Sequence, residues 1–141
     1  MEYKVMSQKE LAIYMSKTHK QKTVVISISD IANEGQFVVV HTSKNNICGC
    51  IAVYFDDVDN GPTAITEQTA KNIVSFVDAT YAQTDKIIVQ CGAGISRSAG
   101  VCAAIMKAKE SDDSPIFNNP RFCPNMLCYR LVLQAFMEKG E

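Results

Sequence analysis

Apolar residues along the chain fall into runs of two kinds. Short runs rich in valine and isoleucine favour buried strands, because β-branched side chains pack well on a pleated sheet. Strands are predicted on this basis at 23–29, 37–41, 51–55 and 86–90. Longer segments carry apolar residues at helical spacing, with polar residues between them. Helices are predicted there at 7–17, 66–81, 98–109 and 125–137.

The order of these segments predicts the fold class. Strands that alternate with helices are typical of an α/β domain with a mostly parallel sheet. The chain of 141 residues has the length of one ordinary domain. We therefore expect a single domain spanning 1–141, in which a central, mostly parallel β-sheet is flanked by α-helices.

The composition excludes several classes of protein. Hydrophobic residues make up 47% and charged residues 21% of the chain, as in a globular domain. A net charge of −1 lacks the basic surface of a nucleic-acid binder, so no nucleic acid is expected as a partner. No apolar run approaches the roughly 18–20 residues of a membrane span, and the N-terminus lacks a signal pattern. The sequence predicts a cytoplasmic monomer that does not contact a membrane.

Six cysteines are scattered through the chain, mostly within apolar runs. Their spacing matches neither a disulfide framework of an exported domain nor the paired clusters of a structural zinc site. We expect most of them to be small buried side chains. A redox pair or a metal site formed by Cys48 and Cys50 with His41 is a weaker alternative, and no metal or cofactor is expected.

The chemistry is concentrated between 87 and 100. A buried strand ends at Cys91, a loop of small residues follows, and a helix begins near Arg97 and Ser98. A glycine-rich turn at a helix N-terminus directs backbone N–H groups into one concavity, where the helix dipole favours an anion. An arginine side chain binds two oxygens of a tetrahedral anion at once. The segment therefore predicts a phosphate-binding loop.

A cysteine at the base of such a loop lies in a field that favours the thiolate. Cys91 is then a nucleophile that faces the phosphorus of a bound ester, and Ser98 can donate a hydrogen bond to its sulfur. Of the six cysteines, only Cys91 is followed by arginine at the sixth position. The plain alternative is a glycine-rich turn with a buried cysteine and a surface arginine. A dinucleotide-binding turn is excluded because position 97 is not glycine.

The segment from Cys91 to Ser98 resembles the signature loop of the cysteine-based protein tyrosine phosphatase superfamily, in particular its compact, dual-specificity-like members. The resemblance implies a phosphomonoester hydrolase that works through a cysteinyl-phosphate without a metal. It implies Cys91 as nucleophile, Arg97 as phosphate clamp and Ser98 as the donor to the sulfur. The residues expected to surround the substrate phosphate are Gly92, Ala93, Gly94, Ile95, Ser96 and Arg97.

The family also uses an upstream aspartate as general acid. The acidic turn after the strand at 51–55 lies in the corresponding place, and the segment 55–58 resembles the Phe-x-Asp-Ile segment of small microbial members. This favours Asp57 as the acid, followed by Asp59 and then Asp56. A solvated acidic turn without a catalytic role is the alternative for each of them.

One position departs from the family pattern. Gln90 stands where the family usually has histidine before the nucleophile; it can hydrogen-bond loop carbonyls but carries no charge. A catalytically weak or inactive module that binds phosphate or phosphopeptide is therefore the second hypothesis. Sulfur transfer or arsenate reduction on a similar loop is a third, against which the position of Cys91 in the chain argues.

The loop also bears on the substrate. The side chains between Cys91 and Arg97 include no lysine, which favours one bound phosphate over the several phosphates of an inositol lipid. The expected substrate is a phosphorylated protein, on tyrosine or with dual specificity, or a small phosphomonoester.

Overall fold

The computed structural model describes all 141 residues of the chain. Its elements in chain order are β1 (Glu2–Ser7), α1 (Gln8–Met15), β2 (Thr23–Ser29), η1 (Ile31–Asn33), β3 (Ile47–Tyr54), α2 (Glu67–Thr80), η2 (Tyr81–Gln83), β4 (Lys86–Cys91), α3 (Arg97–Glu110), α4 (Ser114–Phe117) and α5 (Met126–Glu138). No helix combines the length and apolar character that crossing a lipid bilayer requires.

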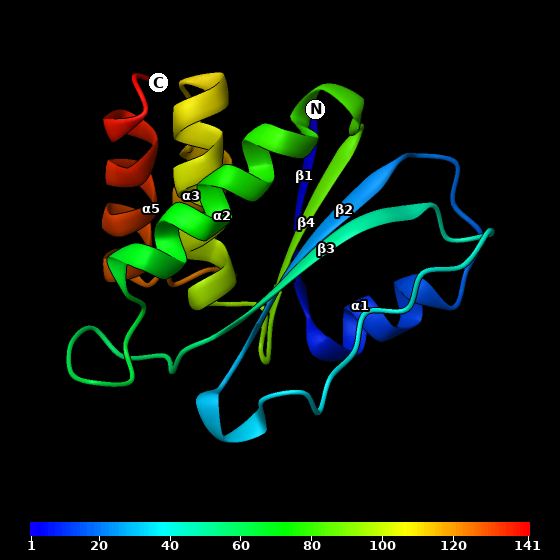
Figure 1. The fold of residues 1–141 in the computed structure, drawn as a ribbon, viewed down its shortest axis with the longest axis horizontal. Helices are drawn as coiled ribbons and strands as arrows, with labels where there is room; N and C mark the ends of the chain where they lie inside the picture. Colours follow the sequence, from blue (N-terminus) through cyan, green and yellow to red (C-terminus); the bar gives the residue numbers. More distant parts are fainter.

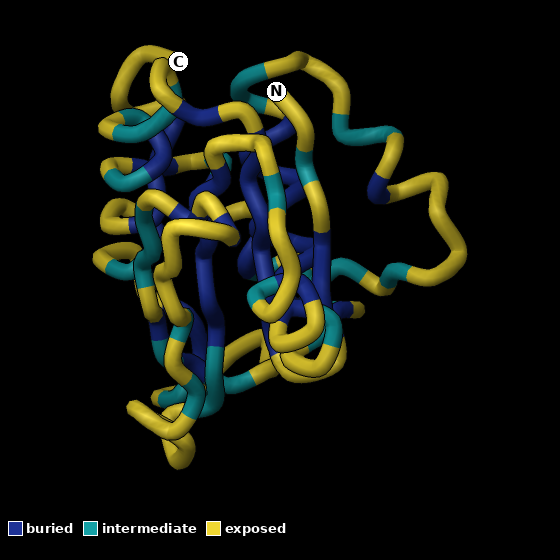
Figure 2. The backbone as a smooth tube through the Cα atoms, turned by 90° about the vertical axis from the view of Figure 1, so that its right-hand side faces the viewer, coloured by how far each residue is buried: buried dark blue, intermediate teal, exposed yellow.

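The four strands form one parallel sheet in the order β1-β4-β2-β3. Helices α2, α3 and α5 cover one face, and α1 lies on the other (Figure 1). The two central strands, β4 and β2, are almost wholly buried. Figure 2 shows that the buried backbone lies in the interior of the molecule. The predicted single α/β domain with a parallel sheet is confirmed. All four strands run in the same direction, so the segments that follow them meet at one edge of the sheet.

The predicted strand at 37–41 does not form. Phe37 and Val39 pack against the smaller core on the α1 face, whereas the side chains of Val38 and Val40 are 66% and 51% exposed. The alternation is that of a half-buried strand, but this segment lies over the sheet and pairs with no strand. Its backbone is held by side chains instead, because Asn45 Nδ2 donates to the Val40 carbonyl oxygen at 2.8 Å.

The structure adds one strand that the apolar pattern did not predict. β1 pairs with β4 along its whole length and places Ser7 opposite Cys91. Ser7 then caps α1, since its hydroxyl accepts from the Glu10 N–H and the Glu10 carboxylate accepts from the Ser7 N–H. The end of β1 is thereby fixed beside the segment that follows Cys91.

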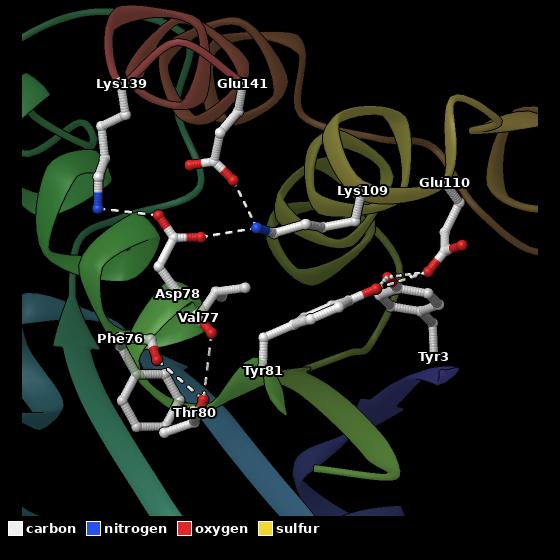
Figure 3. Close-up of polar contacts among 10 residues, drawn as sticks. All are labelled: Tyr3, Phe76, Val77, Asp78, Thr80, Tyr81, Lys109, Glu110, Lys139 and Glu141. Atoms are coloured by element: carbon white, nitrogen blue, oxygen red, sulfur yellow. Dashed lines mark hydrogen bonds and ion pairs between the residues drawn. The ribbon is translucent and has the colours of Figure 1, made fainter. Parts of the chain in front are cut away.

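A polar cluster joins α2, α3 and the C-terminal residues at the opposite end of the molecule from the loop that follows Cys91. Lys109 Nζ lies between the carboxylates of Asp78 and Glu141, and Lys139 binds the second oxygen of Asp78 at 2.8 Å (Figure 3). Partial burial acts to raise the pKa of the Asp78 carboxyl, but hydrogen bonds from the two lysines outweigh it and lower that pKa to about 2.

Candidate active site

The loop from 92 to 96 connects the end of β4 to the start of α3 at the carboxyl edge of the sheet (Figure 1). Gly94 has φ +67°, and a Cβ atom there would lie 2.4 Å from the Ser7 backbone nitrogen. The Gln8 N–H also donates to the Gly92 carbonyl oxygen at 3.1 Å. The close approach of β1 therefore requires glycine at 94, and it fixes the shape of the loop.

Cys91 and Ser98, on either side of this loop, lie close together. Both are buried, and Cys91 Sγ lies 3.0 Å from Ser98 Oγ. Ser96 occupies the N-cap position of α3, but its side chain makes no capping hydrogen bond. The first N–H groups of α3 therefore have no side-chain cap to satisfy them, and together with the helix dipole they favour an anion above the cysteine sulfur.

Arg97 is the first residue of α3, and its guanidinium is buried and anchored on one side. Nη1 donates to Asp30 Oδ1 and to the Phe55 carbonyl oxygen, each at 2.7 Å. Nη2 faces the loop, 3.9 Å from the position that a Cβ atom of Gly92 would occupy. The contacts on Nη1 orient the guanidinium so that Nη2 is directed toward the loop. Asp30 is not among the site residues predicted from the sequence.

The three candidate acids lie in different surroundings. Asp57 Oδ1 accepts from Ser96 Oγ at 2.9 Å and from Asn125 Nδ2 at 3.0 Å, so this carboxylate lies against the loop. Asp56 Oδ1 accepts from the Ile31 N–H at 3.2 Å and holds the segment after β2. Asp59 is exposed and lines an open hollow beside Asp57. Asp57 alone of the three bonds to a side chain of the loop.

Asn125 is a second residue that the sequence analysis did not connect with the site. Its Oδ1 caps α5 by accepting from the Cys128 N–H, while its Nδ2 donates to Asp57 and to the Val58 carbonyl oxygen. The Asn125 N–H donates to the Ser96 carbonyl oxygen at 3.0 Å. A Cβ atom at Gly100 would lie 2.4 Å from the Asn125 carbonyl oxygen, so glycine permits this close packing. The start of α5 thus joins the loop to the acidic turn.

Two hollows flank the loop. The hollow on the α1 side has a volume of about 170 Å³ and is lined in part by Gln8, Asp30, Asn33 and Phe37. The hollow on the α5 side is wider and more open, about 650 Å³, and lies between the acidic turn and the start of α5. Access to the loop is therefore broad on the side of Asp57.

Gln90 turns away from the loop carbonyls that the sequence analysis considered for it. Its side chain lies on the α1 face of the sheet, where Oε1 accepts from Ser27 Oγ at 2.6 Å. Its Nε2 is buried and has no hydrogen-bond partner. An unpaired buried amide costs free energy, so the Gln90 side chain slightly destabilises the folded protein.

The remaining cysteines form no disulfide. Burial raises the pKa of the Cys102 and Cys128 thiols to about 12. Cys48 and Cys123 are exposed, so only half of the six cysteines are buried rather than most of them. His41 Nδ1 contacts the Ile47 carbonyl oxygen at 2.8 Å, and no group of three His, Cys, Asp or Glu side chains lies close enough to hold a metal ion.

Comparisons with known proteins bear on the fold. No family model and no curated protein matches the sequence. Human DUSP28 matches with a TM-score of 0.59 at 14% identity, over 98% of this chain and 93% of that chain. The human tyrosine phosphatase-like serine/threonine/tyrosine-interacting protein matches with a TM-score of 0.57 at 16% identity, over 95% and 84%.

A third solved structure, PTPMT1 in complex with PI(5)P, matches with a TM-score of 0.56 at 15% identity, over 84% of this chain and 78% of that chain. At these identities the similarity concerns the fold. The chain has the α/β fold of the compact, dual-specificity-like tyrosine phosphatases, as the sequence analysis expected.

Proposed function

We propose that this chain is a phosphomonoester hydrolase of the tyrosine or dual-specificity kind, acting through a cysteinyl-phosphate. The observation that carries the proposal is the placement of Cys91 Sγ 3.0 Å from Ser98 Oγ, at the base of a loop that ends in an uncapped helix N-terminus. Arg97, oriented by Asp30, completes a site for a tetrahedral dianion.

In the first step the Cys91 thiolate attacks phosphorus, the bond from phosphorus to the ester oxygen breaks, and Asp57 gives its proton to that oxygen. Both contacts of the Asp57 carboxyl are made to Oδ1, so Oδ2 is the oxygen that carries the proton. The N–H groups of the loop and the Arg97 guanidinium stabilise the charge on the equatorial oxygens.

In the second step water attacks phosphorus and gives a proton to the Asp57 carboxylate. The sulfur–phosphorus bond breaks, and its electron pair returns to Cys91 as thiolate. Ser98 Oγ, 3.0 Å from the sulfur, donates a hydrogen bond that stabilises this leaving group. Inorganic phosphate is released, and the site is restored for another cycle.

Hydrolysis of an aryl phosphate in the presence of a chelator tests the proposal. We expect Cys91→Ser to abolish turnover, because a serine hydroxyl cannot replace the thiolate as nucleophile. We expect Asp57→Asn to lower kcat by about 10²–10⁴ and to remove the dependence on a protonated acid. Asp59→Asn is the matched control. Turnover that survives Cys91→Ser would contradict the mechanism, and a larger loss in Asp59→Asn than in Asp57→Asn would reassign the acid.

A phosphate-binding module with negligible turnover is the second candidate function. The observation that favours it is Gln90, which is uncharged, directed away from the loop and left with a buried unpaired amide nitrogen. Under this alternative, tungstate raises the Tm of the wild type and not of Arg97→Ala, while no aryl phosphate is hydrolysed. Turnover that depends on Cys91 would exclude it.

A further inference from the structure

We propose that the site takes a single phosphate carried on a protein segment with basic residues beside the phosphorylated side chain. This inference rests on the proposed function and names its substrate class. The proposal follows from the charges and apolar side chains around the loop, because these side chains contact the part of the substrate that flanks the bound phosphate.

The charged residues that line the two hollows are acidic except for Arg97. Arg97 is the sole cation lining either hollow, and it is paired with Asp30. Asp57 and Asp59 line the hollow on the α5 side, with no lysine or arginine among its lining residues. The only charged residues that line the hollow on the α5 side are therefore these two carboxylates.

These carboxylates act on whatever flanks the phosphate. Asp57 and Asp59 are exposed to solvent, so the Asp59 carboxylate and Oδ2 of Asp57, whose Oδ1 is held by Ser96 and Asn125, can face a bound chain. Asp59 takes no part in the proposed proton transfer, so its carboxylate is a second acidic group that the flanking residues meet. Lysine or arginine on the substrate would be attracted here, whereas glutamate or a second phosphate would be repelled over the roughly 10 Å at which charges still act in moderate salt.

The apolar side chains around the loop favour a protein over a small ester. Ile95 at the tip of the loop is 41% exposed, and Val58 and Met126 in the wide hollow are 37% and 47% exposed. They come from three different segments that meet around the phosphate site. Exposed apolar side chains that gather in one place are typical of a contact surface. A peptide chain can cover them while its phosphate occupies the loop.

The same charges oppose a polyphosphorylated lipid headgroup as the substrate. A solved structure of similar fold, PTPMT1, contains PI(5)P. In the present chain the residues between Cys91 and Arg97 include no cation, and additional phosphates would meet Asp57 and Asp59. An inositol lipid is therefore the competing source of phosphate, and it forms a separate arm of the test.

The test uses peptides that carry one phosphotyrosine between flanks of lysine, glutamine or glutamate, otherwise identical. We expect kcat/KM to decrease from lysine to glutamine to glutamate flanks, with about tenfold or more between the extremes. High salt should reduce that ratio, because screening weakens the attraction. The ratio is taken within one protein, so any loss of rate common to all peptides cancels.

Two variants locate the effect. Asn60→Lys adds one positive charge in the wide hollow, at an exposed residue with no assigned catalytic role, and should lower the lysine-to-glutamate ratio severalfold. Asn72→Lys adds the same charge on an exposed position of α2 and should leave the ratio unchanged. Hydrolysis of a small aryl phosphate by Asn72→Lys should match the wild type. For Asn60→Lys the readout is the ratio between peptides within the variant, from which any change in rate common to all peptides cancels.

The outcomes separate the two proposals. A lysine-to-glutamate ratio near one, an inverted ratio, or faster hydrolysis of vesicles that contain phosphatidylinositol phosphate would overturn the substrate class while leaving Cys91-dependent turnover of the aryl phosphate intact. If no phosphate ester is hydrolysed, the proposed function fails. In that case the Kd values of the same peptides for the wild type test the charge preference. Tighter binding of the lysine peptide would support the preference, and equal binding would overturn it.

Discussion

At the scale of single residues, the Arg97 side chain is oriented by residues that lie far from it in the sequence. Its buried guanidinium uses Nη1 for Asp30 and the Phe55 carbonyl oxygen and directs Nη2 toward the loop. A guanidinium held in this way would lose little rotational freedom on binding the proposed phosphate, which is the advantage of a pre-organised site.

Removing that anchor should weaken the site without unfolding the protein. We expect Asp30→Ala to lower kcat/KM for an aryl phosphate about tenfold, mainly by raising KM, because the guanidinium must then be ordered by the substrate itself. The Asp30 side chain is 48% exposed, so the Tm should change little. If Asp30 instead competes with phosphate for Arg97, kcat/KM of the variant would rise, and the positioning role would be wrong.

From the sequence, proximity in the fold can be predicted for residues that lie within one short segment. Cys91, Arg97 and Ser98 are fixed by their spacing across one strand, loop and helix, and the structure brings them together. Asp30 lies 67 positions before Arg97, and Asn125 lies 68 positions after Asp57. Nothing in the local pattern of either segment reports that pairing. A polar residue directly after a buried strand was the one available signal for Asp30.

At the scale of elements, the start of α5 connects the loop at 92–96 to the acidic turn. Asn125 uses its oxygen to cap α5 and its nitrogen to hold Asp57 and the Val58 carbonyl. The two roles belong to different atoms of one side chain. They can therefore be separated by substitution.

We expect Asn125→Ser to keep the cap and lose the bonds to the acidic turn, since serine is as good an N-cap as asparagine but has no amide to donate. Its free energy of unfolding should stay close to that of the wild type, while Asn125→Ala should cost about 1 kcal/mol. Both variants should lower kcat about tenfold, because Asp57 is less well placed. A normal kcat in Asn125→Ser, measured with an aryl phosphate alongside urea unfolding, would show that the turn needs no support from α5.

The elements themselves were predicted unevenly, for a physical reason. The segments that became β2, β4, α2, α3 and α5 carry strong apolar patterns and face one large core. β1 and the segment 37–41 are only half covered. β1 mixes polar and apolar residues yet gains a full set of pairings with β4. The segment 37–41 has the alternation of a strand but packs against the core on the α1 face and joins no sheet. Whether such a segment becomes a strand depends on whether a neighbouring strand can pair with it, and the local sequence pattern does not show that partner.

At the scale of the whole molecule, the candidate active site and a stabilising polar cluster lie at opposite ends of the sheet. The carboxyl edge carries the loop, the acidic turn and both hollows, where buried charge and an unpaired amide are tolerated. The opposite end holds the cluster of Asp78, Lys109, Lys139 and Glu141, which ties α2, α3 and the residues after α5 together (Figure 3). Changes in that cluster should alter stability and leave the chemistry of the loop unaffected.

Acid unfolding tests this separation. The pKa of the Asp78 carboxyl is lowered from 3.8 to about 2 in the folded protein, so its ion pairs stabilise the fold above the unfolded-state value and are lost as the pH falls through the folded-state value. We expect Asp78→Asn to reduce the free energy of unfolding by about 1 kcal/mol near neutral pH. The deficit should shrink between about pH 4 and pH 2, where the wild type also loses the charge.

Asp59→Asn, at an exposed carboxylate of the acidic turn, is the matched control and should show no such convergence. Urea unfolding across this pH range measures the effect, with aryl phosphate turnover of Asp78→Asn expected to equal that of the wild type. A constant deficit at all pH values would mean that the Asp78 charge does not stabilise the fold.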